Sequence, residues 1–258
     1  MTTGLIALTH LPSPNLQGGE RTYIGRDPID PALALRQHER YRDALRACGA
    51  TVMLLDDNRN MPDCVFVEDT AIVLDEVAVM MSMGAESRRG EVPAIERALR
   101  AFRQIERVPL PATIDGGDVV RSGRALYVGA SPRTNAAGIE SLRNIVQPFG
   151  YTVTAVPVHG CLHLKSACSA LPDGRFLVNP DWIDVRPLDG PLLRVHNAEP
   201  FAGDVLTIDS SIIASDAFPE TIAILRQDFR VIPVSVSEFA KAEGGVTCLS
   251  LVFRTTAD

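Results

Sequence analysis

A sequence pattern that recurs along the chain constrains the fold more than any other feature. It consists of a polar or glycine-rich tip, an apolar strand, a turn and a second strand. Complete copies begin at four positions, Phe66, Ile114, Leu162 and Phe201. The copies follow one another at intervals of about 40 to 50 residues, which is the spacing of propellers and other repeat architectures. A chain of this kind is expected to place equivalent units around an axis.

A fifth copy begins at Gly244 and has only one strand, GGVTCLSLVF, before the sequence ends. The apolar segment near the N-terminus, GLIALTHL, is a strand without a neighbouring partner. We therefore predict that the two ends of the chain pair with each other and close the five units into a ring.

Most units also contain a helix and a third strand. In the first helix, Asp30 is a cap followed by Pro31 at the first helical position, and apolar residues recur at helical spacing until Gly49. The helical segments are 31–48, 91–104, 133–149 and 219–229, whereas NPDWI at 179–183 is only a stub in a helix position. The sequence predicts an α/β fold of five pseudo-repeated ββαβ units, with helices outside and the tips converging at one end of the axis.

Composition and charge limit the classes of partner. With 46% hydrophobic and 22% charged residues, the 258-residue chain has the composition of an ordinary globular protein. Its formal net charge of -7 has the wrong sign for binding nucleic acid or an anionic membrane surface. A small cationic ligand is the partner that this charge favours. No linker divides the sequence, so a single domain over residues 1–258 is expected.

The sequence shows no signal for secretion or membrane insertion. The N-terminus lacks a basic region, its apolar run is broken by His10 and Pro12, and no apolar stretch approaches the length of a membrane helix. The odd number of cysteines and the absence of a CxxC pair argue against a disulfide framework and a structural zinc site. These cysteines are Cys48, Cys64, Cys161, Cys168 and Cys248. We expect a reduced, cytoplasmic protein.

The tips carry an unusual set of titratable groups. Four units far apart in the sequence contribute a thiol, an imidazole and several carboxylates, the components of nucleophilic and acid–base catalysis. They are Glu68 and Asp69, Asp115 and Asp118, His163, and Cys248. If the tips converge, these groups share one site.

Taken singly, these residues have simpler explanations. A lone cysteine near a C-terminus is more often packed in the core, and a histidine between apolar neighbours is usually structural. For Cys248, the adjacent Gly244 and Gly245 favour a functional role, because glycine lets a ligand approach the backbone closely. For His163, the argument is its position at the head of a unit, where other units carry carboxylates.

The carboxylates are open to two interpretations. The motifs DGGD and VED supply hard oxygen ligands of the kind that metal ions bind, but no histidine–carboxylate spacing of a known metal site accompanies them. Without a metal, the cluster needs another cation, and a guanidinium matches several carboxylate oxygens best. A thiol, an imidazole and carboxylates around a guanidinium indicate substitution at its central carbon. We expect neither a metal nor a cofactor.

Six ordered motifs resemble the dimethylarginine dimethylaminohydrolase family of the guanidino-modifying (pentein) superfamily. The resemblance covers nearly the whole chain, from Ala32 to Phe253, and it implies a five-bladed α/β propeller. It also implies hydrolysis of Nω-methylated L-arginines to L-citrulline and dimethylamine or methylamine through a covalent cysteine intermediate. The motifs are FVEDTAIV, GAESRRGE, DGGDVV, PRTNAAG, LHLK and GGVTCLSL.

The resemblance implies a role for each matching residue. The catalytic residues would be the nucleophile Cys248, the general acid and base His163, and Asp115, which would orient His163. The guanidinium would bind to Glu68 and Asp69, the substrate carboxylate to Arg88 and Arg133, and the α-amine to Asp63, assisted by backbone carbonyls near Arg21 and Ala242.

Some features depart from the family pattern and leave alternatives open. Residues 15–27 align with the family's mobile lid but keep none of its familiar sequences, and Glu243 replaces a frequent aspartate. Deiminases of the superfamily usually carry an aspartate two residues after the catalytic histidine, where this chain has Lys165. An arginine deiminase-like activity, a hydrolase of another N-substituted arginine and a catalytically inactive binding propeller are the alternatives. The sequence leaves open whether the protein is a homodimer.

Overall fold

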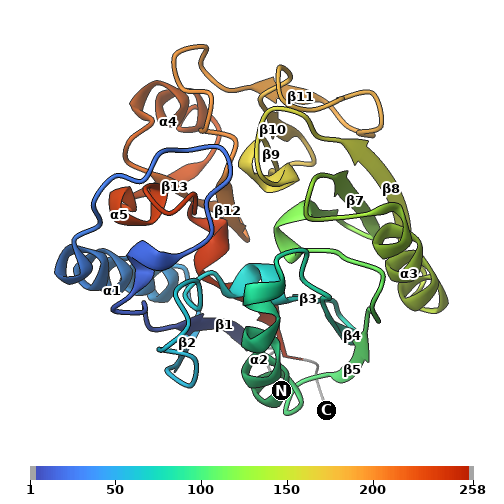
Figure 1. Ribbon diagram of the computed structural model, residues 1–258. Helices are drawn as coiled ribbons and strands as arrows, with labels where there is room; N and C mark the ends of the chain where they lie inside the picture. The colour runs from blue at the N-terminus through green and yellow to red at the C-terminus, as the bar shows by residue number, and fades with distance from the viewer. Residues whose placement is uncertain (1–3, 256–258) are drawn as a thin grey trace.

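The computed structural model describes residues 4–255, which form five three-stranded sheets arranged in a ring (Figure 1). In each sheet, two antiparallel strands are joined by a third strand that runs parallel to the second. Four sheets use consecutive strands: β3 (Ala71–Val73), β4 (Val77–Met80) and β5 (Gln104–Arg107); β6 (Val119–Ser122), β7 (Ala125–Ala130) and β8 (Thr152–Pro157); β9 (Cys168–Ala170), β10 (Phe176–Val178) and β11 (Leu192–Arg194); β12 (Val205–Ile208), β13 (Ser211–Ser215) and β14 (Arg230–Val234).

The fifth sheet joins the two ends of the described chain. Strand β1 (Leu5–His10) pairs antiparallel with β15 (Leu251–Arg254), so that Ile6 faces Phe253, and parallel with β2 (Thr51–Leu55). This sheet has the same antiparallel-then-parallel pattern as the other four. The predicted ring closure and the predicted five-unit α/β fold are therefore confirmed.

Helices connect the second and third strands of four units and lie on the outside of the ring (Figure 1). They are α1 (Pro31–Ala47), α2 (Val92–Leu99), α3 (Ala136–Val146) and α4 (Pro219–Leu225), and a short helix α5 (Ser237–Ala240) follows β14. The predicted cap of α1 is confirmed, because the Asp30 carboxylate accepts hydrogen bonds from the backbone N–H groups of Ala32 and Leu33. Residues 179–183 form a turn in place of a helix.

The apolar core fills the spaces between adjacent sheets and under the helices. In one cluster, Val79 of β4 and Val128 of β7 pack with Leu142 of α3, and all three side chains are fully buried. Burial of one such side chain contributes about 1.5–3 kcal/mol to stability. No helix among residues 4–255 is both long enough and apolar enough to cross a membrane.

The tips are tighter than the sequence suggests. Four of them are single 3₁₀ turns at the inner ends of the sheets: Val67–Thr70, Gly116–Asp118, Leu164–Ser166 and Thr247–Leu249. His163 precedes its turn and does not belong to a strand, since β9 begins at Cys168. The compact turn allows both carboxylates of the VEDT tip to be buried near the axis, where a strand would direct them to opposite faces.

Candidate active site

A small cavity of about 20 Å³ lies where the tips meet, with room for little more than one water molecule. Seven of the residues expected from the sequence line it: Asp63, Asp69, Arg88, Arg133, His163, Ala242 and Cys248. Glu68 and Asp115 lie behind this lining, in contact with other residues of the site. Arg21 does not line the cavity, whereas its neighbour Glu20 does.

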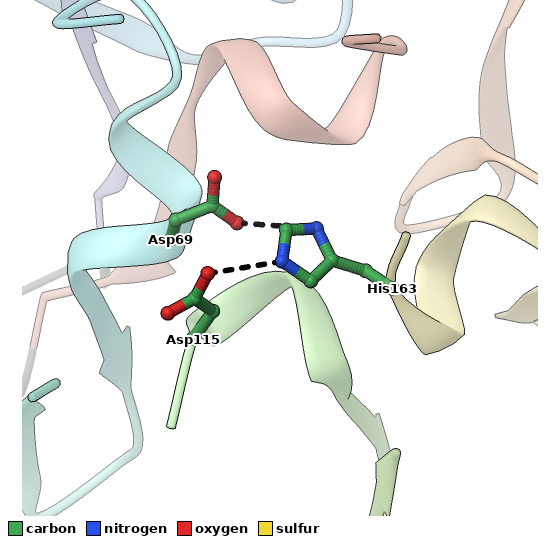
Figure 2. Close-up of side chains that lie close together, drawn as sticks. All are labelled: Asp69, Asp115 and His163. Carbon is green, nitrogen blue, oxygen red and sulfur yellow. Dashed lines mark hydrogen bonds and ion pairs between the residues drawn. The ribbon is translucent and has the colours of Figure 1, made fainter. Parts of the chain in front are cut away.

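Two aspartates from different tips hold His163 (Figure 2). Nε2 of His163 lies 3.0 Å from Oδ2 of Asp115, and Nδ1 lies 3.7 Å from Oδ1 of Asp69. Burial alone would lower the pKa of His163, but the carboxylates of Asp69, Asp118 and Asp115 outweigh it and raise that pKa to about 9. The imidazole is therefore protonated at neutral pH.

Gly117 permits this arrangement. A Cβ atom at this position would lie 2.6 Å from Oδ1 of Asp69 and 2.7 Å from Nδ1 of His163, closer than side chains can pack. The Gly117 backbone N–H donates to the same Asp69 oxygen. The glycine of the DGGD motif thus brings the histidine and the carboxylate together.

Asp115 is completely buried and has a contact for each oxygen. Its Oδ1 accepts a hydrogen bond of 2.8 Å from the backbone N–H of Gly84, and its Oδ2 faces His163. The backbone contact fixes the carboxylate, so the imidazole ring has one preferred orientation. This is the contact that the expected orienting role requires.

Cys248 lies in the 3₁₀ turn of the last unit, and its Sγ accepts a hydrogen bond of 3.3 Å from the backbone N–H of Gly245. Burial raises the pKa of the Cys248 thiol well above its ordinary value, and the carboxylates of Asp204 and Glu68 add to the shift. Without a cation in the site, the thiol therefore stays protonated.

Glu68 is paired within the protein. One carboxylate oxygen lies 2.6 Å from Nζ of Lys165, and the other accepts a hydrogen bond of 2.7 Å from the Thr247 hydroxyl. Burial raises the pKa of Glu68, although the Lys165 ammonium opposes the shift. Lys165 thus neutralises the carboxylate that the sequence assigned to the guanidinium.

Arg88 is also fully engaged. Its guanidinium donates to Asp69 at 2.6 Å and to Glu91 at 2.9 Å and 3.2 Å, and it contacts the Phe66 backbone carbonyl at 3.0 Å. All these side chains are buried. In this arrangement Arg88 orients Asp69 at the cavity, and its predicted contact with the substrate carboxylate stays a prediction.

Arg133 and Asp63 line the cavity, and each has side-chain atoms that could form further hydrogen bonds with a ligand. The Nη1 atom of Arg133 is buried, has no hydrogen-bond partner among residues 4–255, and lies 3.8 Å from Oδ2 of Asp115. Asp63 accepts one hydrogen bond at 3.0 Å from the backbone N–H of Glu20, and burial raises its pKa despite the nearby Arg88. An anion beside Arg133 and an ammonium beside Asp63 would complete both groups.

Sequence reasoning missed two residues that support the site, the half-buried Asp204 and the buried Thr247. Asp204 accepts a hydrogen bond of 3.0 Å from the backbone N–H of Thr247, next to the thiol, and burial together with Glu68 raises its pKa to about 7. Thr247 links Asp204 to Glu68 through its hydroxyl group. The sequence does contain a feature that could have identified Asp204. The tip FAGD of the unit that begins at Phe201 has the same Gly-Asp pair as the DGGD tip of the unit that begins at Ile114.

Asp69, Asp115 and His163 also form an arrangement that a metal ion could use. One ligand atom from each residue lies within 4.8 Å of the others. The two carboxylates already raise the pKa of the imidazole, however, and a protonated histidine cannot be a ligand. At neutral pH a metal ion would have to displace that proton.

A ring of five α/β units with a cysteine, a histidine and carboxylates at its axis defines the class of guanidino-modifying enzymes known as penteins. Within that class, residues 26–168 match the family model for eukaryotic N,N dimethylarginine dimethylhydrolase. The chain belongs to the dimethylarginine dimethylaminohydrolase family.

Individual relatives support this assignment over the full length. The N(G),N(G)-dimethylarginine dimethylaminohydrolase of Streptomyces coelicolor is 41% identical, with 98% of each chain covered. That of Pseudomonas aeruginosa is 34% identical over 92% of this chain and 94% of its own. A solved structure of a cysteine-to-serine variant of the Pseudomonas aeruginosa enzyme with citrulline superposes with a TM-score of 0.90 at 30% identity, covering 98% of this chain and 100% of that one.

Proposed function

We propose that this protein hydrolyses Nω-methylated L-arginines to L-citrulline and dimethylamine or methylamine. The observation that carries the proposal is that Cys248, His163 and Asp69 line one cavity. Nearby carboxylates raise the pKa of the imidazole to about 9, and burial raises the pKa of the thiol, so both groups hold their protons when no substrate is bound. Such a site has a general acid ready for a departing amine. Its nucleophile gains thiolate character only when a guanidinium brings positive charge.

The first half of the reaction forms a covalent intermediate. The guanidinium binds beside Asp69, its charge stabilises the Cys248 thiolate, and the thiol proton leaves to solvent. Sγ attacks the central carbon to give a tetrahedral adduct, and the imidazolium of His163 donates its proton to the methylated nitrogen. The C–N bond breaks, methylamine or dimethylamine departs, and a cationic amidino-thioether remains on Cys248.

The second half regenerates the site. His163 is now neutral and removes a proton from a water molecule as its oxygen attacks the same carbon. The second tetrahedral adduct collapses with cleavage of the C–S bond, and its hydroxyl proton passes to the departing sulfur. Citrulline and the protonated Cys248 thiol are released, and His163 keeps the proton taken from water. Asp115 keeps the imidazole in one orientation through both steps.

The Lys165–Glu68 pair supports methylated arginine over arginine. A site that hydrogen-bonds both terminal NH₂ groups of arginine needs free carboxylate acceptors, and here the Glu68 oxygens are taken by Lys165 and Thr247. Methyl groups cannot donate hydrogen bonds, so they lose nothing where no acceptor is free. Adding a methyl group in an apolar pocket changes the free energy by only about 1–3 kcal/mol, whereas an unmatched polar group costs more.

The test is a comparison of kcat/KM on L-arginine, Nω-monomethyl-L-arginine and asymmetric Nω,Nω-dimethyl-L-arginine, with the released amine identified. We expect both methylated substrates to be preferred and Cys248→Ser to abolish turnover while substrate still binds. Faster release of ammonia from arginine would instead favour the deiminase alternative. Absence of both product and a covalent Cys248 adduct, sought by mass spectrometry, would favour a binding propeller.

The remaining expectations stay predictions. We infer that residues 1–258 act as one catalytic domain in a cytoplasmic setting, which fits the five cysteines, all of them free thiols. The roles of the individual site residues, including the backbone carbonyl near Arg21, are proposals that the variants below test.

A further inference from the structure

Residues 15–27, here called the lid segment, contain the first 3₁₀ turn (Leu16–Gly18) and lead toward α1 (Figure 1). Glu20 of this segment lines the cavity. One attachment is near the cavity, where the backbone N–H of Glu20 donates to Asp63 at 3.0 Å. A Cβ atom at Gly19 would lie only 2.2 Å from the same carboxylate, so this glycine allows the close approach.

The second attachment is Glu243. Its two carboxylate oxygens accept hydrogen bonds from consecutive backbone N–H groups of the lid segment, at 2.6 Å from Thr22 and 2.8 Å from Tyr23. Both contacts join residues about 220 positions apart in the sequence. Hydrogen bonds to a charged acceptor are stronger than neutral ones, and a carboxylate can serve two N–H groups where an amide oxygen can serve only one side.

The backbone at Glu243 is held in an uncommon conformation. Its φ of 65° lies in the left-handed region, which residues other than glycine and asparagine rarely adopt. The turn after α5 imposes this conformation, because the N–H groups of Glu243 and Gly244 donate to carbonyls of Ala240 and Phe239. A residue retained at a strained position is expected to contribute through its side chain.

We propose that Glu243 is the latch that holds the lid segment over the cavity, and that it thereby positions the α-amino end of the substrate. The inference rests on the proposed function. Ala242, whose carbonyl is expected to accept the α-amine, immediately precedes Glu243 and lines the cavity. Asp63, the other group expected at the α-amine, accepts the hydrogen bond from Glu20 at the first attachment of the same segment. Lid closure and recognition of the α-amine therefore depend on the same few groups.

Two variants separate the carboxylate from the backbone turn. Glu243→Gln keeps the left-handed residue and removes the second acceptor, whereas Glu243→Gly removes the side chain and relieves the backbone strain. Glu140→Gln, an exposed glutamate on α3, is the matched control. Glu243→Gln is expected to lower kcat/KM on monomethylarginine by about tenfold, the effect of losing one charge-assisted hydrogen bond. Glu243→Gly loses both hydrogen bonds and is expected to lower kcat/KM by at least as much. The control is expected to keep the wild-type value.

A second readout does not require turnover. Arg21 and Arg26 are trypsin sites within the lid segment, and we expect cleavage there to be faster in both Glu243 variants than in the wild type and the control. Unchanged cleavage in both variants would overturn the latch, whatever the enzyme's substrate proves to be. If the wild type does not turn over methylarginines, the proposed function is wrong. The rate of trypsin cleavage still shows whether Glu243 holds the lid segment.

The third measurement tests the coupling to the α-amine. The wild type is expected to prefer monomethylarginine to 5-(methylguanidino)pentanoate, which lacks the α-amino group, and the Glu243 variants are expected to lose much of that preference. An equal loss of kcat/KM on both compounds would show that Glu243 acts on lid closure without positioning the α-amine, and would overturn that part of the proposal.

Discussion

Nε2 of His163 lies 3.0 Å from Oδ2 of Asp115, although the two residues are 48 positions apart in the sequence. Asp115 is completely buried and is itself fixed by the backbone of Gly84. The contact therefore sets both the direction in which His163 points and the pH range over which it keeps its proton.

Asp115→Asn is expected to shift the alkaline limb of the kcat profile to lower pH. The group that must be protonated is His163, whose pKa is about 9, and loss of the Asp115 charge lowers that pKa. Activity is thus retained below the new pKa and lost earlier as pH rises, by about 1–2 pH units for one hydrogen bond to a charged group. Asp216→Asn, an exposed substitution, is the control. An unmoved limb would contradict the role of Asp115.

The Cys248 thiol is expected to react slowly with iodoacetamide at pH 8, because burial and nearby carboxylates raise its pKa well above the ordinary value. Asp204→Asn removes one of those charges at a pH above the Asp204 pKa of about 7, so the thiol pKa falls and alkylation becomes faster. Mass spectrometry of the Cys248 peptide measures the rate. If Asp204→Asn leaves it at the wild-type value, Asp204 does not control the thiol.

Arg88 and Arg133 are expected to respond differently to substitution. Arg88→Ala leaves Glu91 as a buried carboxylate without its cation and takes the guanidinium away from Asp69, which destabilises the fold by about 3–5 kcal/mol. Urea unfolding measures this loss, and activity is expected to fall for substrates with or without an α-carboxylate. Arg133→Ala is expected to raise KM for methylarginines while methylated agmatine, which lacks the carboxylate, hardly responds. Selective loss for methylarginines in Arg88→Ala would instead support the predicted contact of Arg88 with the substrate carboxylate.

Lys165→Met is expected to destabilise the protein by about 2–4 kcal/mol, somewhat less than a fully buried pair because Lys165 is 20% exposed. The cause is Glu68, which would be left buried without its cation. The double variant Lys165→Met with Glu68→Gln removes the unpaired charge and is expected to recover most of the loss. Chemical unfolding of the three proteins tests this, and a double variant as unstable as the single one would refute the explanation.

The repeat pattern explains how much could be predicted from the sequence. The repeated strand–turn–strand pattern and the helix caps are local features of the sequence. They were sufficient to predict the five units, the ring closure and the helix positions. The positions of Cys248 and His163 at tips also followed from the pattern, because equivalent units place equivalent residues at the axis. Asp204 was missed although its tip shares the Gly-Asp pair of DGGD.

Contacts between units could not be predicted, because no local signal specifies them. Lys165 reaches Glu68 from 97 positions away, and Glu243 reaches Thr22 from 221 positions away. For the same reason Arg88 looked free in the sequence, whereas the 3₁₀ helix Glu86–Glu91 turns its guanidinium toward Glu91 and Asp69. These partners are set by how the units pack around the axis.

The pairing of β1 with β15 has a consequence for the order of folding. Four sheets assemble from strands that are close in the sequence, but the fifth must bring together segments about 250 residues apart. Contacts between residues so far apart in the sequence form slowly during folding. Cys248 lies three residues before β15. A chain still emerging from the ribosome therefore has its proposed acid and its proposed binding carboxylates before its proposed nucleophile, and we expect catalysis to begin only when the last strand has paired with the first.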